Sequence, residues 1–427
     1  MSNINKVNLC EGFTLHSIKS QKFKTNVVTL YFHVPILKES ITKLALLPSV
    51  LERGSKSHPT FADISKYMQE LYGTSFSCNV RRKGDGAVLF FTLEFVNGKY
   101  IGEDITRKVF EFLYDIVFCP VVKDDMFLPE YVAQEKENLA RFIEGIINDK
   151  REYAAVRCME EMFEGDSYGI PEYGAIADLP AIDGANLYKQ YKDIVNNCMI
   201  DVFFSGDFDE EITQDLFVDV FKDKIFPGKL RPAPTKIAKV SNTDVKKVTE
   251  DMDVNQSKLC MGLTCDTEPD SDEYYALMLC SNIFGGGPFS KLFNNVRERL
   301  SLCYYVGSRV DRLKGIMTIS SGIEPAKYQE AFDEIMFQLS EMKNGNITNE
   351  EITAAKKYIT NGLNSMKDSL FVMEDYYLSQ ILLNQNLSVD DFLENVMKVT
   401  KEQIVAAANK IKLDTIFLVS ANIGGEA

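Results

Sequence analysis

The order of predicted helices and strands repeats within this chain, and the repeat limits the folds that it can adopt. In the first half the expected elements are a strand at 27–34, helices at 40–54 and 60–72, strands at 75–81 and 87–95, and long helices at 103–118 and 131–147. In the second half they are a strand at 259–264, helices at 272–283 and 290–299, strands at 303–310 and 316–322, and long helices at 326–342 and 349–366. A unit that recurs in this way predicts an internal duplication.

The pattern within each repeat predicts an α+β fold rather than a parallel α/β one. Leu89, Phe91, Leu93 and Phe95 alternate with smaller or polar residues, as a sheet with one apolar face requires. We therefore expect two homologous halves, each a mainly antiparallel sheet packed with helices. Three prolines in segment 226–235 indicate an extended connection. The predicted domains are 1–225 and 246–427, joined by a linker at 226–245.

Composition excludes several classes of function. The 427 residues carry a formal charge of −15, which argues against nucleic-acid binding because phosphate contacts need a basic face. The N-terminus lacks the pattern of a signal peptide, and no apolar run approaches the length of a membrane span. Nine scattered cysteines without a C-x-x-C pair suggest reduced thiols. We expect a cytoplasmic protein that binds neither membranes nor nucleic acids.

One helical segment, Leu46-Leu-Pro-Ser-Val-Leu-Glu-Arg53, has the frame of a zinc site without its histidines. An inverted zinc protease motif, H-x-x-E-H, places two imidazoles four residues apart with a glutamate between them. Here Ser49 and Arg53 stand at the imidazole positions, and Glu52 keeps that of the catalytic base. Serine is a poor zinc ligand and a guanidinium is always charged, so neither replaces an imidazole. We expect no metal in this chain and no peptide hydrolysis by it alone.

Three segments resemble the M16 metallopeptidase family, the group of pitrilysin and the mitochondrial processing peptidase. They are Leu47-Pro-Ser-Val-Leu-Glu-Arg-Gly54, similar to L-x-H-x-x-E-H-x; Glu137-Asn-Leu-Ala-Arg-Phe-Ile-Glu144, similar to E-x6-E; and the long run from Phe284 to Tyr304, similar to G-G-x-x-S-x-L-F-x-x-V-R-E-x-x-x-L-x-Y. The resemblance extends over essentially the whole chain. It implies a LuxS/M16-like fold in each half and a clamshell arrangement of the two.

The resemblance also assigns roles to individual residues. It places the third zinc ligand of the family at Glu144, and the substrate-holding arginine and tyrosine at Arg297 and Tyr304. A guanidinium and a phenol can both polarise a peptide carbonyl. We also form the hypothesis that Arg53 replaces the missing zinc charge through an ion pair with Glu144 or Glu52.

A chain that lacks the zinc ligands but keeps this pair resembles the inactive member of the paired M16 proteins of Gram-positive bacteria. This implies a non-catalytic subunit of a heteromeric zinc peptidase, with zinc in a partner that carries H-x-x-E-H, a peptide substrate, and a heterodimer or self-dimer. Two alternatives remain open. One is a structural M16 scaffold without a catalytic role. The other is an autonomous hydrolase of another class, which would have to use one of three histidines.

Overall fold

A computed structural model describes residues 4–230, 234–239 and 244–421 of the chain. They form two compact units, which are described one at a time. The first unit comprises Met1–Glu144, Ile170–Pro234 and Lys367–Leu382, and the second comprises Gly145–Gly169, Thr235–Met366 and Leu383–Ala427. The predicted linker lies partly outside the described residues. Among those that are described, no helix is both long and apolar enough to cross a bilayer.

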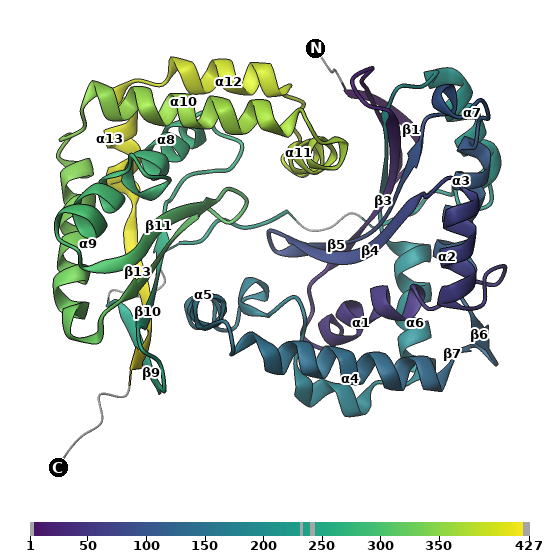
Figure 1. The fold of residues 1–427 in the computed structure, drawn as a ribbon, viewed down its shortest axis with the longest axis horizontal. Helices are drawn as coiled ribbons and strands as arrows, with labels where there is room; N and C mark the ends of the chain where they lie inside the picture. The colour runs from purple at the N-terminus through teal and green to yellow at the C-terminus, as the bar shows by residue number, and fades with distance from the viewer. Residues whose placement is uncertain (1–3, 231–233, 240–243, 422–427) are drawn as a thin grey trace. The chain divides into compact units, whose positions relative to one another are not determined.

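The first unit is built on a six-stranded sheet in the order β1-β2-β8-β3-β5-β4 (Figure 1). Neighbouring strands are antiparallel except β2 and β8, which are parallel. The strands are β1 (Ile4–Cys10), β2 (Phe13–Lys19), β3 (Thr25–Pro35), β4 (Ser75–Lys83), β5 (Gly86–Val96) and β8 (Ile200–Gly206).

Helices cover one face of this sheet and bury the alternating apolar stripe that the sequence predicted. Leu89, Phe91, Leu93 and Phe95 all lie in the same core cluster as the apolar faces of the helices. The helices are α1 (Ile41–Leu51), α2 (Phe61–Glu70), α3 (Thr106–Phe118), α4 (Pro129–Ile146), α6 (Gly184–Asn197) and α7 (Glu210–Phe221). Two short strands, β6 (Val122–Lys123) and β7 (Met126–Phe127), form a separate hairpin.

The second unit has a five-stranded sheet in the order β11-β12-β10-β13-β9. Its strands are β9 (Lys246–Met252), β10 (Ser257–Thr264), β11 (Cys303–Asp311), β12 (Ile316–Ile323) and β13 (Lys412–Ala421). Its helices are α8 (Glu273–Gly285), the π-helix η4 (Leu292–Arg299), α9 (Tyr328–Lys343), α10 (Asn349–Met366), α12 (Val389–Lys398) and α13 (Lys401–Lys410).

The two sheets share one topology, and this confirms the predicted α+β fold class. Read from the outer strand, β4-β5-β3-β8-β2 and β11-β12-β10-β13-β9 each contain three antiparallel pairs followed by one parallel pair. The strand β1 is an addition in the first unit. The correspondence makes the outer strands β4 and β11 equivalent.

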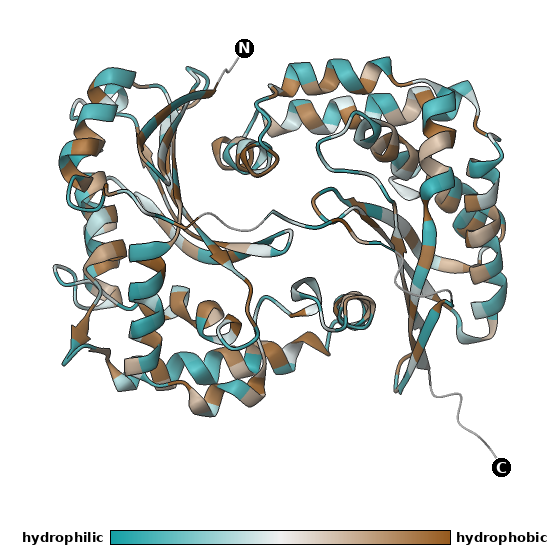
Figure 2. Ribbon diagram, turned by 180° about the vertical axis from the view of Figure 1, so that it is seen from behind, coloured by the Kyte–Doolittle hydropathy of each residue, from teal (hydrophilic) through white to brown (hydrophobic). Residues whose placement is uncertain are grey.

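Each unit also contains one helix from the other half of the sequence. The helix α5 (Lys150–Met162) follows α4 in the chain but packs on β10 and β13 of the second unit. The helix α11 (Leu370–Leu382) follows α10 but packs on β3 and β8 of the first unit, and it is drawn largely brown in Figure 2. The predicted domains were continuous in sequence, whereas the compact units are not, because of this exchange.

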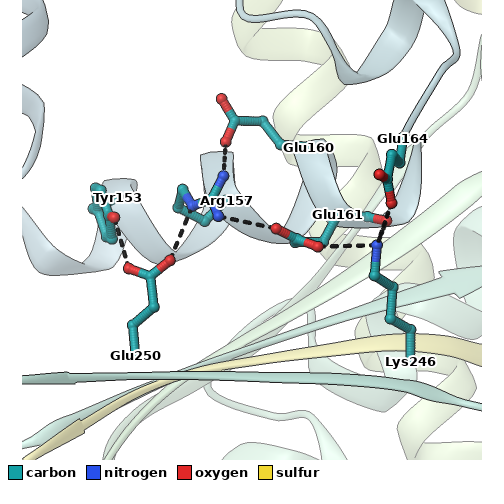
Figure 3. Close-up of polar contacts among 7 residues, drawn as sticks. All are labelled: Tyr153, Arg157, Glu160, Glu161, Glu164, Lys246 and Glu250. Atoms are coloured by element: carbon teal, nitrogen blue, oxygen red, sulfur yellow. Dashed lines mark hydrogen bonds and ion pairs between the residues drawn. The ribbon is translucent and has the colours of Figure 1, made fainter.

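Ion pairs fix α5 on the second sheet (Figure 3). Arg157 of α5 binds Glu160 and Glu161 of its own helix and reaches Glu250 of β9, with Nε 3.2 Å from Oε1. Lys246 of β9 places its Nζ 2.9 Å from both Glu161 and Glu164. Beside these contacts, apolar side chains of α5 pack against Cys260 and Phe417. The network therefore determines where the exchanged helix sits on the strands.

Candidate functional site

The segment with the degenerate zinc motif lies at the end of α1. Leu44, Leu47 and Leu51 are buried in the core of the first unit, so the opposite side of the helix, with Ser49, faces outward and is exposed. The helix ends at Leu51, and Glu52 forms its C-cap. Arg53 follows directly, four positions after Ser49, which is the spacing of the sequence motif.

Arg53 is bound to a buried carboxylate on α4. Its Nε lies 2.5 Å from Oε1 of Glu135, and its Nη2 donates to the same oxygen. The other oxygen of Glu135 accepts a hydrogen bond from Nδ2 of Asn138 at 2.9 Å. Glu135 is only 6% exposed, and the guanidinium also lies 5.9 Å from the ring centre of Tyr131. Both carboxylate oxygens are thus satisfied without a metal.

The hypothesis of a compensating ion pair was correct about the arginine and wrong about the carboxylate. We expected Arg53 to bind Glu144 or Glu52, but its partner is Glu135, and Glu144 is exposed on the same helix. Nine residues on an α-helix correspond to about 900°, which places the two glutamates on opposite faces. A signal was present in the sequence, because Glu135 interrupts an apolar stripe between Val132 and Leu139 at helical spacing.

Glu52 is engaged with the outer strand of the first sheet. Its Oε1 accepts a hydrogen bond from the backbone N–H of Cys78 in β4 at 3.1 Å. Burial raises the pKa of the Glu52 carboxyl, and the negative charge of Glu135 raises it further, whereas the Cys78 bond lowers it. The glutamate at the position of a catalytic base therefore holds a strand amide in place.

These residues do not fit a zinc ion. Ser49 offers a neutral hydroxyl, and Arg53 fills the second ligand position with a permanent positive charge. Within the described part of the chain, no group of three His, Cys, Asp or Glu side chains is arranged to hold a metal. The charge that zinc would supply comes from the guanidinium.

Replacing Arg53 by methionine should lower the free energy of unfolding by about 3 kcal/mol, because it leaves the Glu135 carboxylate buried without a cation. Denaturant unfolding followed by circular dichroism would measure the loss. Arg141→Met is the matched control: Arg141 pairs with Glu137 on the exposed side of α4, and such a pair contributes less than about 1 kcal/mol. Equal losses in the two variants would contradict a structural role for the Arg53 pair.

The three histidines are engaged in structural contacts. His16 and His33 place their Nε2 atoms 2.7 and 2.8 Å from the two oxygens of Asp201, and all three residues are buried in the sheet. His58 approaches Asp115 through Nδ1 at 3.3 Å, and the hydroxyl of Ser55 donates to that same aspartate. A serine nucleophile would instead donate to the free nitrogen of the histidine. This geometry does not support an autonomous serine hydrolase.

The second predicted pair lies where α8, η4 and β11 meet. A Cβ added to Gly285 at the end of α8 would lie 2.6 Å from the backbone nitrogen of Ser308, so only glycine lets α8 approach β11 this closely. The register of β11 against β12 shifts between Cys303 and Tyr305. Tyr304 is therefore the extra residue of a β-bulge, a feature that redirects a side chain.

Arg297 and Tyr304 are both exposed. The Arg297 side chain is 42% accessible, and its guanidinium lies 4.7 Å from the ring centre of Phe293. Tyr304 is 52% accessible, and its hydroxyl contacts Oε1 of Glu324 at 3.5 Å. The structure therefore places the two residues in one unit, at the end of η4 and the start of an outer strand. Sequence reasoning missed Glu324, which no motif marked.

The chain is similar in sequence to proteins of known family. The family model of the peptidase M16 inactive domain matches residues 181–359. The chain is 34% identical over 421 residues to the probable inactive metalloprotease YmfF of Bacillus subtilis, a match that covers 97% of each chain. The chain belongs to the peptidase M16 family. With both imidazole positions replaced, it is an inactive M16 homologue.

Solved structures agree with this M16 assignment. A conserved protein from Enterococcus faecalis is similar at 29% identity, with a TM-score of 0.91 over 100% of both chains. A peptidase M16 inactive domain from Pseudomonas fluorescens is similar at 16% identity, with a TM-score of 0.81 over 100% of both chains. The second likeness concerns the fold alone, and it confirms the M16-like architecture of the two sheets.

Proposed function

We propose that this M16 homologue is the non-catalytic subunit of a heteromeric zinc peptidase. In this proposal a partner subunit carries H-x-x-E-H and the zinc, and this chain supplies Arg297 and Tyr304 to the bound peptide. The Arg53–Glu135 pair supports a role without a metal in this chain. All nine cysteines are free, which fits a reducing cytoplasm as the place where the pair acts.

The observation that carries the proposal is the exposure of Arg297, near the end of η4, and of Tyr304, in the outer strand β11. An outer strand has backbone N–H and C=O groups that an extended peptide can use for pairing. The guanidinium and the phenol are then donors beside a peptide carbonyl. Such donors stabilise the oxyanion that forms when a carbonyl is attacked.

A structural scaffold is the second candidate, and local contacts favour it. Arg297 stacks on Phe293 of its own helix, and Tyr304 contacts Glu324 in the loop after β12. Residues retained only for packing would make contacts of this kind. The two candidates differ in whether a peptidase depends on this chain.

Reconstitution with a catalytic M16 protein from the same organism tests the proposal. The two chains would be expressed separately and together, and their association would be measured by analytical ultracentrifugation. Cleavage of a library of unstructured peptides would be compared for each chain alone and for the mixture. We expect a 1:1 complex and cleavage that requires both chains. Association without any gain in cleavage would support the scaffold, and absence of association would contradict both subunit roles.

A further inference from the structure

The exchanged helix α11 carries a carboxyl group into the interior of the first unit. Glu374 is fully buried between α11 and the sheet. Its Oε2 accepts a hydrogen bond from the hydroxyl of Thr29 on β3, and its Oε1 accepts one from Ser205 on β8, both at 2.6 Å. The Thr29 hydroxyl also lies 3.0 Å from that of Thr92 on β5. A carboxyl group therefore meets neutral partners on two strands.

The cations near α11 bind the neighbouring aspartates instead. Asp375 forms ion pairs with Arg81 at 2.9 Å and Lys83 at 2.8 Å, both on the outer strand β4. Asp368, just before the helix, is bound to Lys22. Asp375 is about a third exposed and Asp368 about two thirds, so these pairs lie at the rim. The helix thus has charged contacts at its edges and an uncompensated carboxyl at its centre.

Burial without a cation favours the protonated form of this group. Desolvation raises the pKa of Glu374 to about 7, although the hydrogen bonds from Ser205 and Thr29 act in the opposite direction. When α11 leaves the sheet, the carboxyl regains water and its ordinary pKa of about 4.5. The docked helix therefore binds a proton more tightly than the released helix. Protonation of Glu374 stabilises the docked helix. This stabilisation is lost as the pH rises from about 4.5, the pKa of the carboxyl in the released helix, through about 7.

Other ionisable groups lie near α11, and any test must distinguish their titration from that of Glu374. Those on the same face of the sheet or beside α11 are Lys6 of β1, His16 of β2, Lys22 before β3, Tyr31 and His33 of β3, Arg81 and Lys83 of β4, Glu94 of β5, Asp201 of β8, Asp368 just before α11, and Asp375, Tyr376 and Tyr377 of α11 itself. Burial alone would raise the pKa of Asp201, but hydrogen bonds from the two histidines and their charge hold it well below its usual range. The Asp201 carboxyl near α11 therefore titrates far below neutrality and does not contribute to a change near pH 7.

We infer that Glu374 makes α11 a pH-sensitive latch, which is held most firmly at acid pH and loosens as the pH rises through neutrality. The helix connects α10 to α12 of the second unit, so its release would free the one segment of the second half that belongs to the first unit. This inference does not depend on the peptidase role. It requires only the buried carboxyl, its two hydroxyl partners and the exchanged position of the helix.

Hydrogen exchange of the peptide covering 367–382, followed by mass spectrometry, would test the latch in the full-length protein. After correction for the intrinsic exchange rate, the opening equilibrium of α11 in the wild type should rise about tenfold between about pH 6 and about pH 8.5. Glu374→Gln removes the ionisation and keeps the size of the side chain. This variant should show little of the rise, whereas Asp375→Asn, which changes an adjacent charge, should retain it.

Two results would overturn the inference. One is a wild-type opening equilibrium that stays constant over this pH range. The other is a Glu374→Gln variant with the same slope as the wild type, because a group other than Glu374 would then be responsible. If the glutamine variant fails to fold, infrared spectroscopy of the wild type decides. The carbonyl band of a protonated carboxylic acid should disappear with a midpoint near pH 7, and its absence at about pH 6 would also exclude the latch.

Discussion

Turnover by the reconstituted peptidase should fall by about 10²–10³-fold when Arg297 is replaced by alanine or Tyr304 by phenylalanine. Each change removes one donor to a developing oxyanion, and such a donor typically contributes this factor. Because the interaction strengthens in the transition state, the loss should appear in kcat more than in KM. Steady-state kinetics with a fluorogenic peptide would measure it. Both side chains are exposed, so complex formation and thermal stability should change little.

Two other residues of the same unit provide matched controls. Arg299 lies two positions after Arg297 on the same π-helix, and it is exposed and paired with Glu334. Tyr358 is an exposed tyrosine of the same unit that packs on Phe289. Arg299→Ala and Tyr358→Phe should leave turnover within about twofold of the wild type. Unchanged activity in both Arg297 and Tyr304 variants would leave the structural scaffold as the explanation.

Introducing histidines at Ser49 and Arg53 together should create a zinc site at the end of α1. The two imidazoles would stand one helical turn apart, and the removal of the guanidinium would free the buried carboxylate of Glu135 as a third ligand. We expect one zinc per chain with a dissociation constant of about 1 μM or below, about 8 kcal/mol of binding free energy. Elemental analysis and calorimetric titration would measure the content and the affinity.

Thermal unfolding provides a second measurement for the rebuilt site. Without metal the double variant should be less stable than the wild type, because it has lost the Arg53 ion pair. Zinc at about 100 times its dissociation constant should restore about 2.7 kcal/mol, and a chelator should reverse the gain. Adding Glu135→Gln should abolish tight binding, whereas adding Glu144→Gln should not. Tight zinc binding by the wild type, or equal effects of the two glutamine substitutions, would contradict the ligand assignment.

The sequence allowed much of the fold to be predicted because local periodicity reports local structure. The helix expected at 349–366 is α10, Asn349–Met366, and the strand expected at 303–310 is β11, Cys303–Asp311. The helix expected at 290–299 is instead a π-helix, a difference of one residue in hydrogen-bond spacing that apolar periodicity does not resolve. The outer strand β9 alternates between exposed and partly exposed residues and gave no apolar signal.

The site was harder to predict, because the contacts of each glutamate depend on which side of its helix it lies. Motif spacing led to Glu144, yet a shift of nine residues along α4 reverses the face and separates the exposed Glu144 from the buried Glu135. The motif frame itself identified Ser49, Glu52 and Arg53 as neighbours on one element, since they lie within two turns. The contact between Glu52 and the amide of Cys78 joins separate elements, and no local pattern encodes it.

The partner sheets of α5 and α11 could not be read from sequence for a related reason. An amphipathic helix needs an apolar surface to pack on, but its pattern does not say which of two similar sheets provides that surface. Since the repeats place α5 and α11 at corresponding positions, each would fit the sheet of its own half by periodicity alone. The contacts that decide, such as that of Glu250 with Arg157, join residues far apart in sequence.

The exchange of helices also sets the order in which the chain can fold while it is being synthesised. The sheet of the first unit leaves the ribosome early, but the helix that covers β3 and β8 follows it by well over a hundred residues, since Ser205 and Glu374 are 169 positions apart. In the opposite sense, α5 emerges before any strand of its own sheet and waits until β13 is made near the end of the chain. The core between the first sheet and its own helices, which extends to Phe221, can close early. The layer beneath α11 and the core beneath α5 can close only when translation is almost complete. One face of the finished first sheet therefore stays open while well over a hundred further residues are made. This is the stage at which a chaperone would be expected to bind the nascent chain.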